Sequence, residues 1–346
     1  MSSQELVRLV GVTASPYTQK MVALLRYRRV PYAITWGDPG QACDALGVEK
    51  PRPAFMPTFF FDDAGSTRAV CDSTPIIRRL EEMYPERSVL PQDPALAFID
   101  YLIEDFADEW CTKYMFHYRW YPKADIDNAG NLLPLGFDVS MVPEQLAQMK
   151  NWVVEKQTGR LYVVGSNDTT APVIDASYRR FLQAMEDHLA NQKFMLGARP
   201  GAGDFGLYGQ LTQLVGFDPT PRNITHEVSL RTVAWVDHMD DQSGLEPQEQ
   251  DWMKLDEQPD SLRSLMAEIG RVYAPAQLAN AGAVAAGDKA WKAEIDGAQW
   301  TQRTFPYQAK CLLWTNERYR ALSEAERASV DALLLGTGVE AMLSLA

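Results

Sequence analysis

Residues 12–20, Val-Thr-Ala-Ser-Pro-Tyr-Thr-Gln-Lys, form the stretch of this sequence that decides its fold. An apolar run at 6–10 precedes the stretch and another at 21–25 follows it, which predicts a strand-to-helix turn. Pro16 suits a first helical position, where its fixed φ is already helical and its missing N–H needs no partner. Ser15 then caps the helix beside free backbone N–H groups and the positive end of the helix dipole. Taken alone, the stretch fits both an ordinary capped turn and a site that holds a thiolate or carboxylate.

The composition is that of an acidic, folded globular protein. The chain has 346 residues, of which 46% are hydrophobic, so two domains and a sizeable core are expected. Its formal charge of −13 argues against nucleic acid and anionic membranes as partners, because both need clustered Lys and Arg. There is no apolar run of about 18 residues, and residues 1–5 lack the features of a signal peptide. A cytoplasmic location is therefore expected.

The cysteines and histidines do not form a recognisable ligand pattern. Cys43, Cys71, Cys111 and Cys311 are widely scattered, and so are the four histidines. None of their spacings is typical of a zinc site or of a disulfide framework. The sequence therefore predicts no bound metal.

Residues 1–88 alternate between strand and helix signals. Strands are predicted at 6–12, 32–36, 58–61 and 68–71, and helices at 20–29, 41–46 and 75–83. Residues 62–66 have the chemistry of a hairpin turn. The order βαβ, short helix, ββ and final helix predicts an α+β unit with a mixed sheet.

Residues 89–346 are predicted to be all-α. A proline-marked linker at 84–94 precedes an apolar helical stripe that runs from Leu96 to Trp110. Further helices are predicted at 143–157, 175–191, 202–216, 225–240, 261–279, 289–296, 306–321 and 323–335. A loop rich in Pro, Asp, Asn and Gly is predicted at 122–136, and a competing strand signal occurs at 161–164.

Three motifs in the first part resemble those of the cytosolic glutathione transferase family. Ser15-Pro16-Tyr17 lies where several classes carry Ser-Pro-Phe or Cys-Pro-Phe after the first strand. Met56-Pro57 resembles the family's Val-Pro pair, in which the proline is cis and the preceding backbone pairs with the cysteinyl part of glutathione. Asp72-Ser73 resembles the pair that binds the γ-glutamyl end. The resemblance implies a thioredoxin-like domain at 1–88 and an all-helical domain at 89–346.

A fourth match lies in the second part. Residues 197–205 resemble the family segment that begins a buried helix with a Ser or Thr cap and an Asp three residues later. Gly201 replaces the cap residue here, and Asp204 is predicted to have a structural role.

The resemblance implies activation of the glutathione thiol. A free cysteine thiol has a pKa of about 8.5, and a hydroxyl at Ser15 beside a helix N-terminus favours its anion. The thiolate then attacks a small hydrophobic electrophile. A serine forms no mixed disulfide, which disfavours thiol–disulfide exchange. Thr13 and Tyr17 are rival hydroxyls, while strand alternation predicts that Cys71 is buried packing.

The remaining predicted contacts follow from the same resemblance. The expected glutathione-binding residues are Tyr17, Arg52, Met56, Pro57, Asp72 and Ser73. Tyr114, His117 and Tyr118 lie at i, i+3 and i+4 of one helix, so one face is expected to line the electrophile pocket. Trp110 is expected in the core, and Arg119 is an alternative contact for a glutathione carboxylate.

The chain also departs from the family pattern. Phe55 stands where some serine classes place a lysine, which leaves Arg52 or Lys50 to hold the glycyl carboxylate. An insertion near 122–142 and a helical tail from about 246 exceed the usual length, and the tail is predicted to cover the cleft, extend the core or replace the usual dimer contact. Two functions remain open: a glutathione transferase, in which a homodimer is allowed, and a non-catalytic binding protein of the same fold. Lyase or peroxidase activity at the same site is not separable by sequence.

Overall fold

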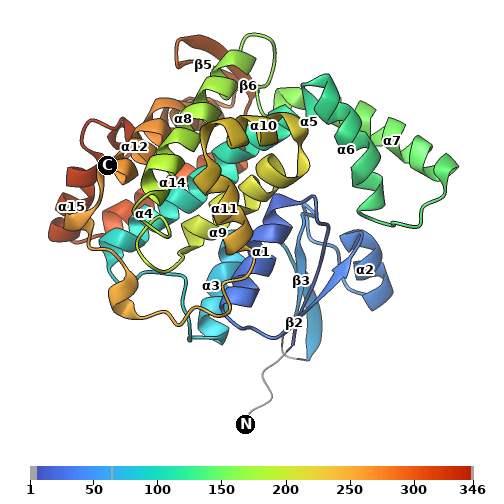
Figure 1. Ribbon diagram of the computed structural model, residues 1–346, viewed down its shortest axis with the longest axis horizontal. Helices are drawn as coiled ribbons and strands as arrows, with labels where there is room; N and C mark the ends of the chain where they lie inside the picture. The colour runs from blue at the N-terminus through green and yellow to red at the C-terminus, as the bar shows by residue number, and fades with distance from the viewer. Residues whose placement is uncertain (1–5, 64, 344–346) are drawn as a thin grey trace.

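The structure is a computed structural model that describes residues 6–63 and 65–343 (Figure 1). The predicted absence of a signal peptide at 1–5 lies outside the described residues. The N-terminal part contains strands β1 (Val7–Gly11), β2 (Tyr32–Trp36), β3 (Thr58–Asp63) and β4 (Ser66–Val70), with helices α1 (Pro16–Tyr27), α2 (Pro39–Leu46) and α3 (Ser73–Met83). These elements confirm the predicted order βαβ, short helix, ββ and helix.

The N-terminal sheet is mixed and has the strand order β2-β1-β3-β4. β1 runs parallel to β2 and antiparallel to β3, which pairs with β4 as a hairpin. Side chains alternate between the two faces of a strand, so Phe59 and Phe61 enter the main core while Phe60 enters a smaller cluster beneath α2. Both faces of the sheet are therefore covered by helices.

The C-terminal part is largely helical. Its helices are α4 (Pro94–Phe106), α5 (Thr112–Trp120), α6 (Lys123–Leu135), α7 (Pro143–Thr158), α8 (Ala171–Leu189), α9 (Ala202–Leu211), α10 (Pro219–Val228), α11 (Leu230–Met239), α12 (Asp260–Glu268), α13 (Ala274–Ala286), α14 (Pro306–Ala321) and α15 (Glu324–Leu334). The π-helical turn η1 (Ala107–Cys111) joins α4 to α5, and a second one, η3 (Thr212–Phe217), follows α9. No helix within the described ranges is long and apolar enough to cross a membrane.

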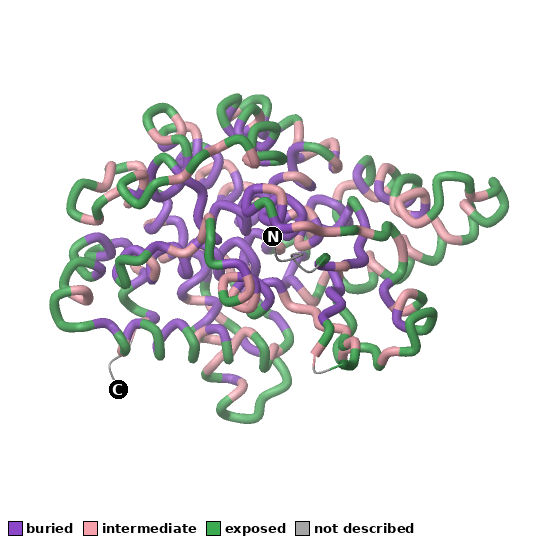
Figure 2. Tube along the Cα trace, turned by 90° about the horizontal axis from the view of Figure 1, so that it is seen from below, coloured by how far each residue is buried: buried purple, intermediate pink, exposed green. Residues whose placement is uncertain are grey.

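Helix α9 lies between the N-terminal part and α4, and small residues permit this close packing. A Cβ atom added at Gly209 would lie 2.5 Å from the carbonyl oxygen of Pro16 in α1. Asp204 accepts hydrogen bonds from the backbone nitrogens of Gly201 and Met195, each at 2.9 Å, which confirms its predicted structural role. One continuous core therefore runs from the sheet into the helices, as the buried centre of the chain in Figure 2 shows.

Three predicted segments were wrong. The expected loop at 122–136 is helix α6, in which Asp125 lies in the first turn and Pro134 is the penultimate residue. The expected helix at 289–296 is strand β5 (Ala290–Ile295), paired with β6 (Ala298–Arg303). Asp296-Gly297 forms the turn between them with positive φ at both residues, the Asp-Gly chemistry of a tight hairpin. The strand signal at 161–164 belongs to the short 3₁₀ helix η2 (Leu161–Val163).

Candidate functional site

The three predicted glutathione motifs meet at one edge of the N-terminal sheet. Val10 pairs with Thr58, and Phe59 pairs with Val70, so the end of β1, the start of β3 and the end of β4 lie side by side. The turn at Ser15, the Met56-Pro57 pair and the Asp72-Ser73 pair extend from these three strand ends. The register thus brings together residues that are far apart in sequence.

Ser15 caps helix α1, as predicted. Its Oγ accepts a hydrogen bond from the backbone nitrogen of Thr18 at 3.2 Å, and the residue is 9% exposed. Pro16 follows as the first helical residue. No described residue accepts the hydroxyl proton of Ser15, so this proton is free to be donated to a ligand at the helix N-terminus.

Side chains from the C-terminal part hold the turn before Ser15 in place. Nη1 of Arg119 donates to the carbonyl oxygen of Ala14 at 3.0 Å, and Nε2 of Gln213 donates to that of Thr13 at 3.2 Å. Arg119 also forms a buried ion pair with Asp218 at 2.9 Å. The alternative prediction that Arg119 contacts glutathione is therefore wrong, because its guanidinium is used to position the turn.

The peptide bond between Met56 and Pro57 is cis, as the family resemblance implies. Met56 is half-buried at the sheet edge and Pro57 is buried. Arg52 and Phe55 are exposed on the preceding segment. Cys71 is half-buried rather than buried, and its thiol donates to the carbonyl oxygen of Pro53 at 3.2 Å.

Asp72 and Ser73 lie at the start of α3, and each already accepts one hydrogen bond from another side chain. The hydroxyl of Tyr307, from α14, donates to Oδ2 of Asp72 at 2.8 Å, and Nζ of Lys20 donates to Oγ of Ser73 at 3.1 Å. Asp72 has a φ of 88°, a backbone conformation that costs about 1–3 kcal/mol in a residue with a side chain and is concentrated at functional sites. Burial raises the pKa of Asp72, and the Tyr307 hydrogen bond partly offsets that rise.

Lys20 is the centre of a buried ion cluster behind this pair. It is 1% exposed and lies 2.9 Å from Oε1 of Glu104 and 2.6 Å from Oδ2 of Asp108. Burial alone would lower the pKa of Lys20, but the two carboxylates raise it above its usual value. Burial opposes the ionisation of Glu104, yet Lys20 and Arg78 lower its pKa to about 2. The cluster thus joins α1, α3 and α4 through charges that depend on one another.

The glutathione contact at Tyr17 stays a prediction, and the hydroxyl of this half-buried residue already has a partner. Its hydroxyl donates to the backbone carbonyl of Asp108 at 2.8 Å, and burial raises its pKa well above the usual value. Tyr17 therefore connects α1 to the π-helical turn η1. Thr13 is exposed, so it remains the rival hydroxyl beside Ser15.

The predicted electrophile pocket at Tyr114, His117 and Tyr118 is also wrong. All three side chains are buried in the helical core, and their polar atoms bond to Ser177, Ser166 and Asp175 on or near α8. Trp110 is fully buried among aromatic rings, as expected. Aromatic residues surround α5 on several faces because the helix is enclosed, and the i, i+3, i+4 pattern therefore does not mark a cleft.

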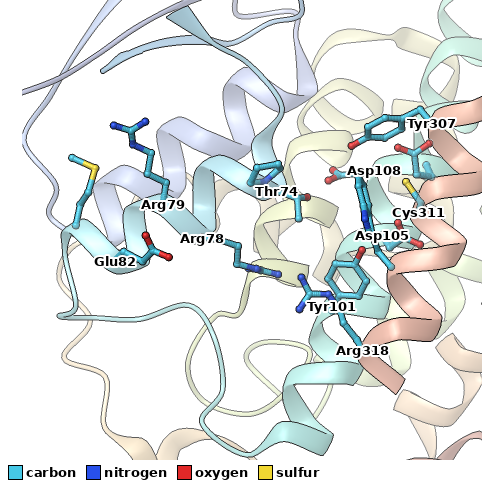
Figure 3. A pocket seen from close by; sticks show the side chains of 14 residues that line it. Thr74, Arg78, Arg79, Glu82, Tyr101, Asp105, Asp108, Tyr307, Cys311 and Arg318 are labelled. Carbon is cyan, nitrogen blue, oxygen red and sulfur yellow. The ribbon is translucent and has the colours of Figure 1, made fainter. Parts of the chain in front are cut away.

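A pocket that the sequence did not predict lies between α3, the α4–η1 segment and α14 (Figure 3). It has a volume of about 760 Å³, and none of the predicted site residues lines it. Its lining from α14 consists of Tyr307, Cys311, Trp314 and Arg318, which lie on one helix face. No group of three or more metal-ligating side chains occurs among the residues that the structure describes.

Comparisons with known proteins support the family resemblance of the N-terminal part of the chain. Residues 9–88 match the family described as glutathione S-transferase, N-terminal domain. No curated protein matches the chain.

Similar solved structures include the β-etherase LigF from Sphingobium sp. strain SYK-6 (16% identity, 68% of this chain and 94% of that one, TM-score 0.41). Another is a Methylobacterium radiotolerans glutathione S-transferase in complex with glutathione sulfonate (16% identity, 70% of this chain and 99% of that one, TM-score 0.36). A third is a Tau class glutathione S-transferase from mango, Mangifera indica (16% identity, 70% of this chain and 94% of that one, TM-score 0.40). Structural similarities at such low sequence identity say nothing about the activity of this chain. The family match over 9–88, on a mixed sheet of the expected order, shows that this part of the chain is a glutathione S-transferase N-terminal domain.

Proposed function

We propose that the protein binds glutathione at the sheet edge formed by Ser15, Met56-Pro57 and Asp72-Ser73, and activates its thiol for attack on a hydrophobic electrophile. The observation that carries this proposal is the Ser15 hydroxyl, which caps α1 while its proton has no acceptor among the described residues. A thiolate placed there receives a charge-assisted hydrogen bond and lies at the positive end of the α1 dipole.

The other motifs supply the remaining contacts in this proposal. Met56, which precedes the cis bond to Pro57 at the sheet edge, pairs its backbone with the cysteinyl unit. Asp72 and Ser73 receive the γ-glutamyl end, and exposed Arg52 is available to the glycyl carboxylate. Trp36 and Phe55, which are 44% and 55% exposed, flank this edge and offer an apolar surface to the second substrate.

The hydrogen bond between Tyr307 and Asp72 favours a second candidate function. Tyr307 already donates to Oδ2 of Asp72, where the γ-glutamyl ammonium is expected to bind, so the two donors compete for one carboxylate. Lys20 already donates to Oγ of Ser73, which leaves only the hydroxyl proton of Ser73 for the ligand. A protein in which these internal contacts persist is a non-catalytic member of the superfamily. The two candidates differ in whether glutathione binds and whether Ser15 then acts on its sulfur.

Calorimetric titration with glutathione, followed by a conjugation assay with an aryl chloride, separates the candidates. Transferase function predicts binding at millimolar glutathione or below, and it predicts that Ser15→Ala slows conjugation at least tenfold. Ser323→Ala is the matched control, because Ser323 caps α15 in the same way but lies outside the site. Absence of binding, or equal rates in Ser15→Ala and Ser323→Ala, would exclude the proposed role of Ser15.

Three further properties stay predictions from the family resemblance. They are the division into domains at 1–88 and 89–346, a homodimeric assembly and a cytoplasmic location.

A further inference from the structure

The pocket between α3, α4–η1 and α14 has two ends of opposite chemical character. In Figure 3, Asp108 and Tyr307 lie at one end, Tyr101 and Arg318 lie at the other, and Asp105 and Cys311 lie between them. Its volume of about 760 Å³ is in the range of small-molecule sites. The pocket adjoins the sheet edge proposed for glutathione, because Tyr307 lines it and donates to Asp72, but none of the residues proposed to bind glutathione lines it. The inference below therefore rests on other residues and does not depend on that function.

One end holds more carboxylates than cations. Asp105, Asp108 and Glu109 lie at i, i+3 and i+4 around the π-helical turn η1, a feature that is frequent at functional sites. Among the described residues, Lys20 pairs with Asp108 and also with Glu104, whereas Arg78 pairs with Glu104 and with none of these three acids. Asp105 accepts from Tyr273, and Glu109 accepts from Gln308, but neither has an ion-pair partner among the described residues.

Asp108 supplies an unused acceptor at this end. It is 9% exposed, its Oδ2 is bonded to Lys20, and its Oδ1 has no hydrogen-bond partner. Burial raises the pKa of Asp108 to about 6, of Asp105 to about 7 and of Glu109 to about 8. An added cation that donates hydrogen bonds would satisfy Oδ1 and stabilise the ionised form of all three carboxyl groups.

The other end presents two arginines, of which Arg318 has no ion-pair partner among the described residues. The guanidinium of Arg318 stacks on the ring of Tyr101 at 4.2 Å. Arg78 uses Nη2 for Glu104 at 3.2 Å, but its buried Nη1 has no partner. Figure 3 shows both guanidinium groups pointing to the Tyr101 end of the pocket, where a carboxylate would be held by two arginines.

The distance between the ends limits the size of the ligand. Tyr101 and Asp108 are seven residues apart on one helical segment, which corresponds to about 10 Å at a rise of about 1.5 Å per residue. An extended dipeptide separates its terminal charges by about 5–7 Å, since each residue spans about 3.5 Å. A hydrogen bond of about 2.8 Å at each end brings the span to about 11–13 Å, close to the length of the pocket.

We propose that this pocket binds a dipolar ligand of dipeptide size with an aromatic side chain, its ammonium at Asp108 and its carboxylate at Arg78 and Arg318. Tyr101 and Trp314, which line the pocket, provide flat apolar contact for the aromatic group. The ammonium supplies the cation that the carboxylate-rich end lacks, and the carboxylate supplies the anion that Arg318 lacks.

Calorimetry with the full chain tests the proposal without any substitution. The probes are L-alanyl-L-phenylalanine, its N-acetyl form, which lacks the ammonium, and its C-terminal amide, which lacks the carboxylate. The expected result is that the unmodified dipeptide binds at least tenfold more tightly than either modified form. Affinities within threefold of each other, or no binding of the unmodified dipeptide at millimolar concentration, would overturn the proposal.

Substitutions then assign each end of the ligand. Arg318→Gln should weaken binding of the free dipeptide at least fivefold and leave binding of the amide unchanged, because the amide makes no use of that charge. Asp108→Asn should weaken the free dipeptide but not the N-acetyl form. Lys310→Gln is the control, since Lys310 is an exposed cation on α14 outside the pocket. Equal losses for the dipeptide and its modified forms in a folded variant would refute the assignment.

Discussion

Replacing Tyr307 with Phe should strengthen glutathione binding. The substitution removes the hydroxyl that donates to Oδ2 of Asp72 at 2.8 Å and keeps the ring, which packs against Trp314. The ligand then no longer competes with this hydrogen bond. The free carboxylate of Asp72 becomes available to the γ-glutamyl ammonium.

The size of the effect follows from the geometry of the contact. A hydrogen bond to a charged group contributes about 1.5–3 kcal/mol when buried, but Tyr307 is 40% exposed and water competes for both partners. A value of about 1 kcal/mol is therefore expected, which corresponds to an approximately fivefold lower Kd for glutathione.

Calorimetric titration of the wild-type protein and Tyr307→Phe measures this change. Tyr319→Phe is the matched control, because Tyr319 also lies on α14 and donates to an aspartate, Asp331, at 2.6 Å, away from the sheet edge. In an Asp72→Ala background, Tyr307→Phe should have no effect on affinity. An unchanged or higher Kd in Tyr307→Phe would refute the view that Tyr307 competes with the ligand for Asp72.

Three further predictions concern stability. Lys20→Met should lower the free energy of unfolding in urea by about 3–5 kcal/mol, because Glu104 and Asp108 stay buried without their cation. Lys50→Met, which removes an exposed ion pair, should change the free energy of unfolding far less. Gly209→Ala should destabilise by about 1–3 kcal/mol through its contact with Pro16, whereas Gly282→Ala, which has open space around it, should be neutral or stabilising; a similar loss in both would contradict the packing argument. Burial raises the pKa of Asp105 to about 7, so the folded state binds this proton more tightly than the unfolded state. The resulting stabilisation of up to about 4 kcal/mol is present at pH 4 and is lost as the pH rises to 7 and above. Asp105→Asn should lack that dependence, and a parallel pH profile of the two proteins would contradict the assignment.

Local patterns were sufficient to predict the N-terminal sheet. Alternating apolar residues, the turn at 62–66 and the Ser15 cap each depend on a few neighbouring residues, and all are present in the structure. The β5–β6 hairpin also had a local signal in Asp296-Gly297, but the apolar residues beside it were interpreted with a helical period. The error there lay in the choice of period, since β5 alternates buried Trp291 and Ile295 with exposed residues.

The contacts that define the site depend on residues far apart in sequence. Tyr307 reaches Asp72 from 235 positions away, and Lys20 reaches Glu104 from 84 positions away. No periodicity or motif specifies such pairs, so sequence placed Asp72 and Ser73 at the site but gave no sign of their internal partners. For Tyr114 and His117 the sequence pattern was visible but ambiguous, because an aromatic stripe on a helix is compatible with a buried core as well as with a ligand pocket.

The pKa of the thiol of bound glutathione tests the central claim most directly. It can be followed through the ultraviolet absorbance of the thiolate as the pH is raised, with saturating protein. The free thiol has a pKa of about 8.5 or higher. If the Ser15 hydroxyl and the α1 N-terminus stabilise the anion, the wild-type complex will titrate at least one unit lower and Ser15→Ala will restore part of that difference. A bound thiol that titrates like free glutathione, with the same value in Ser15→Ala, would contradict the account.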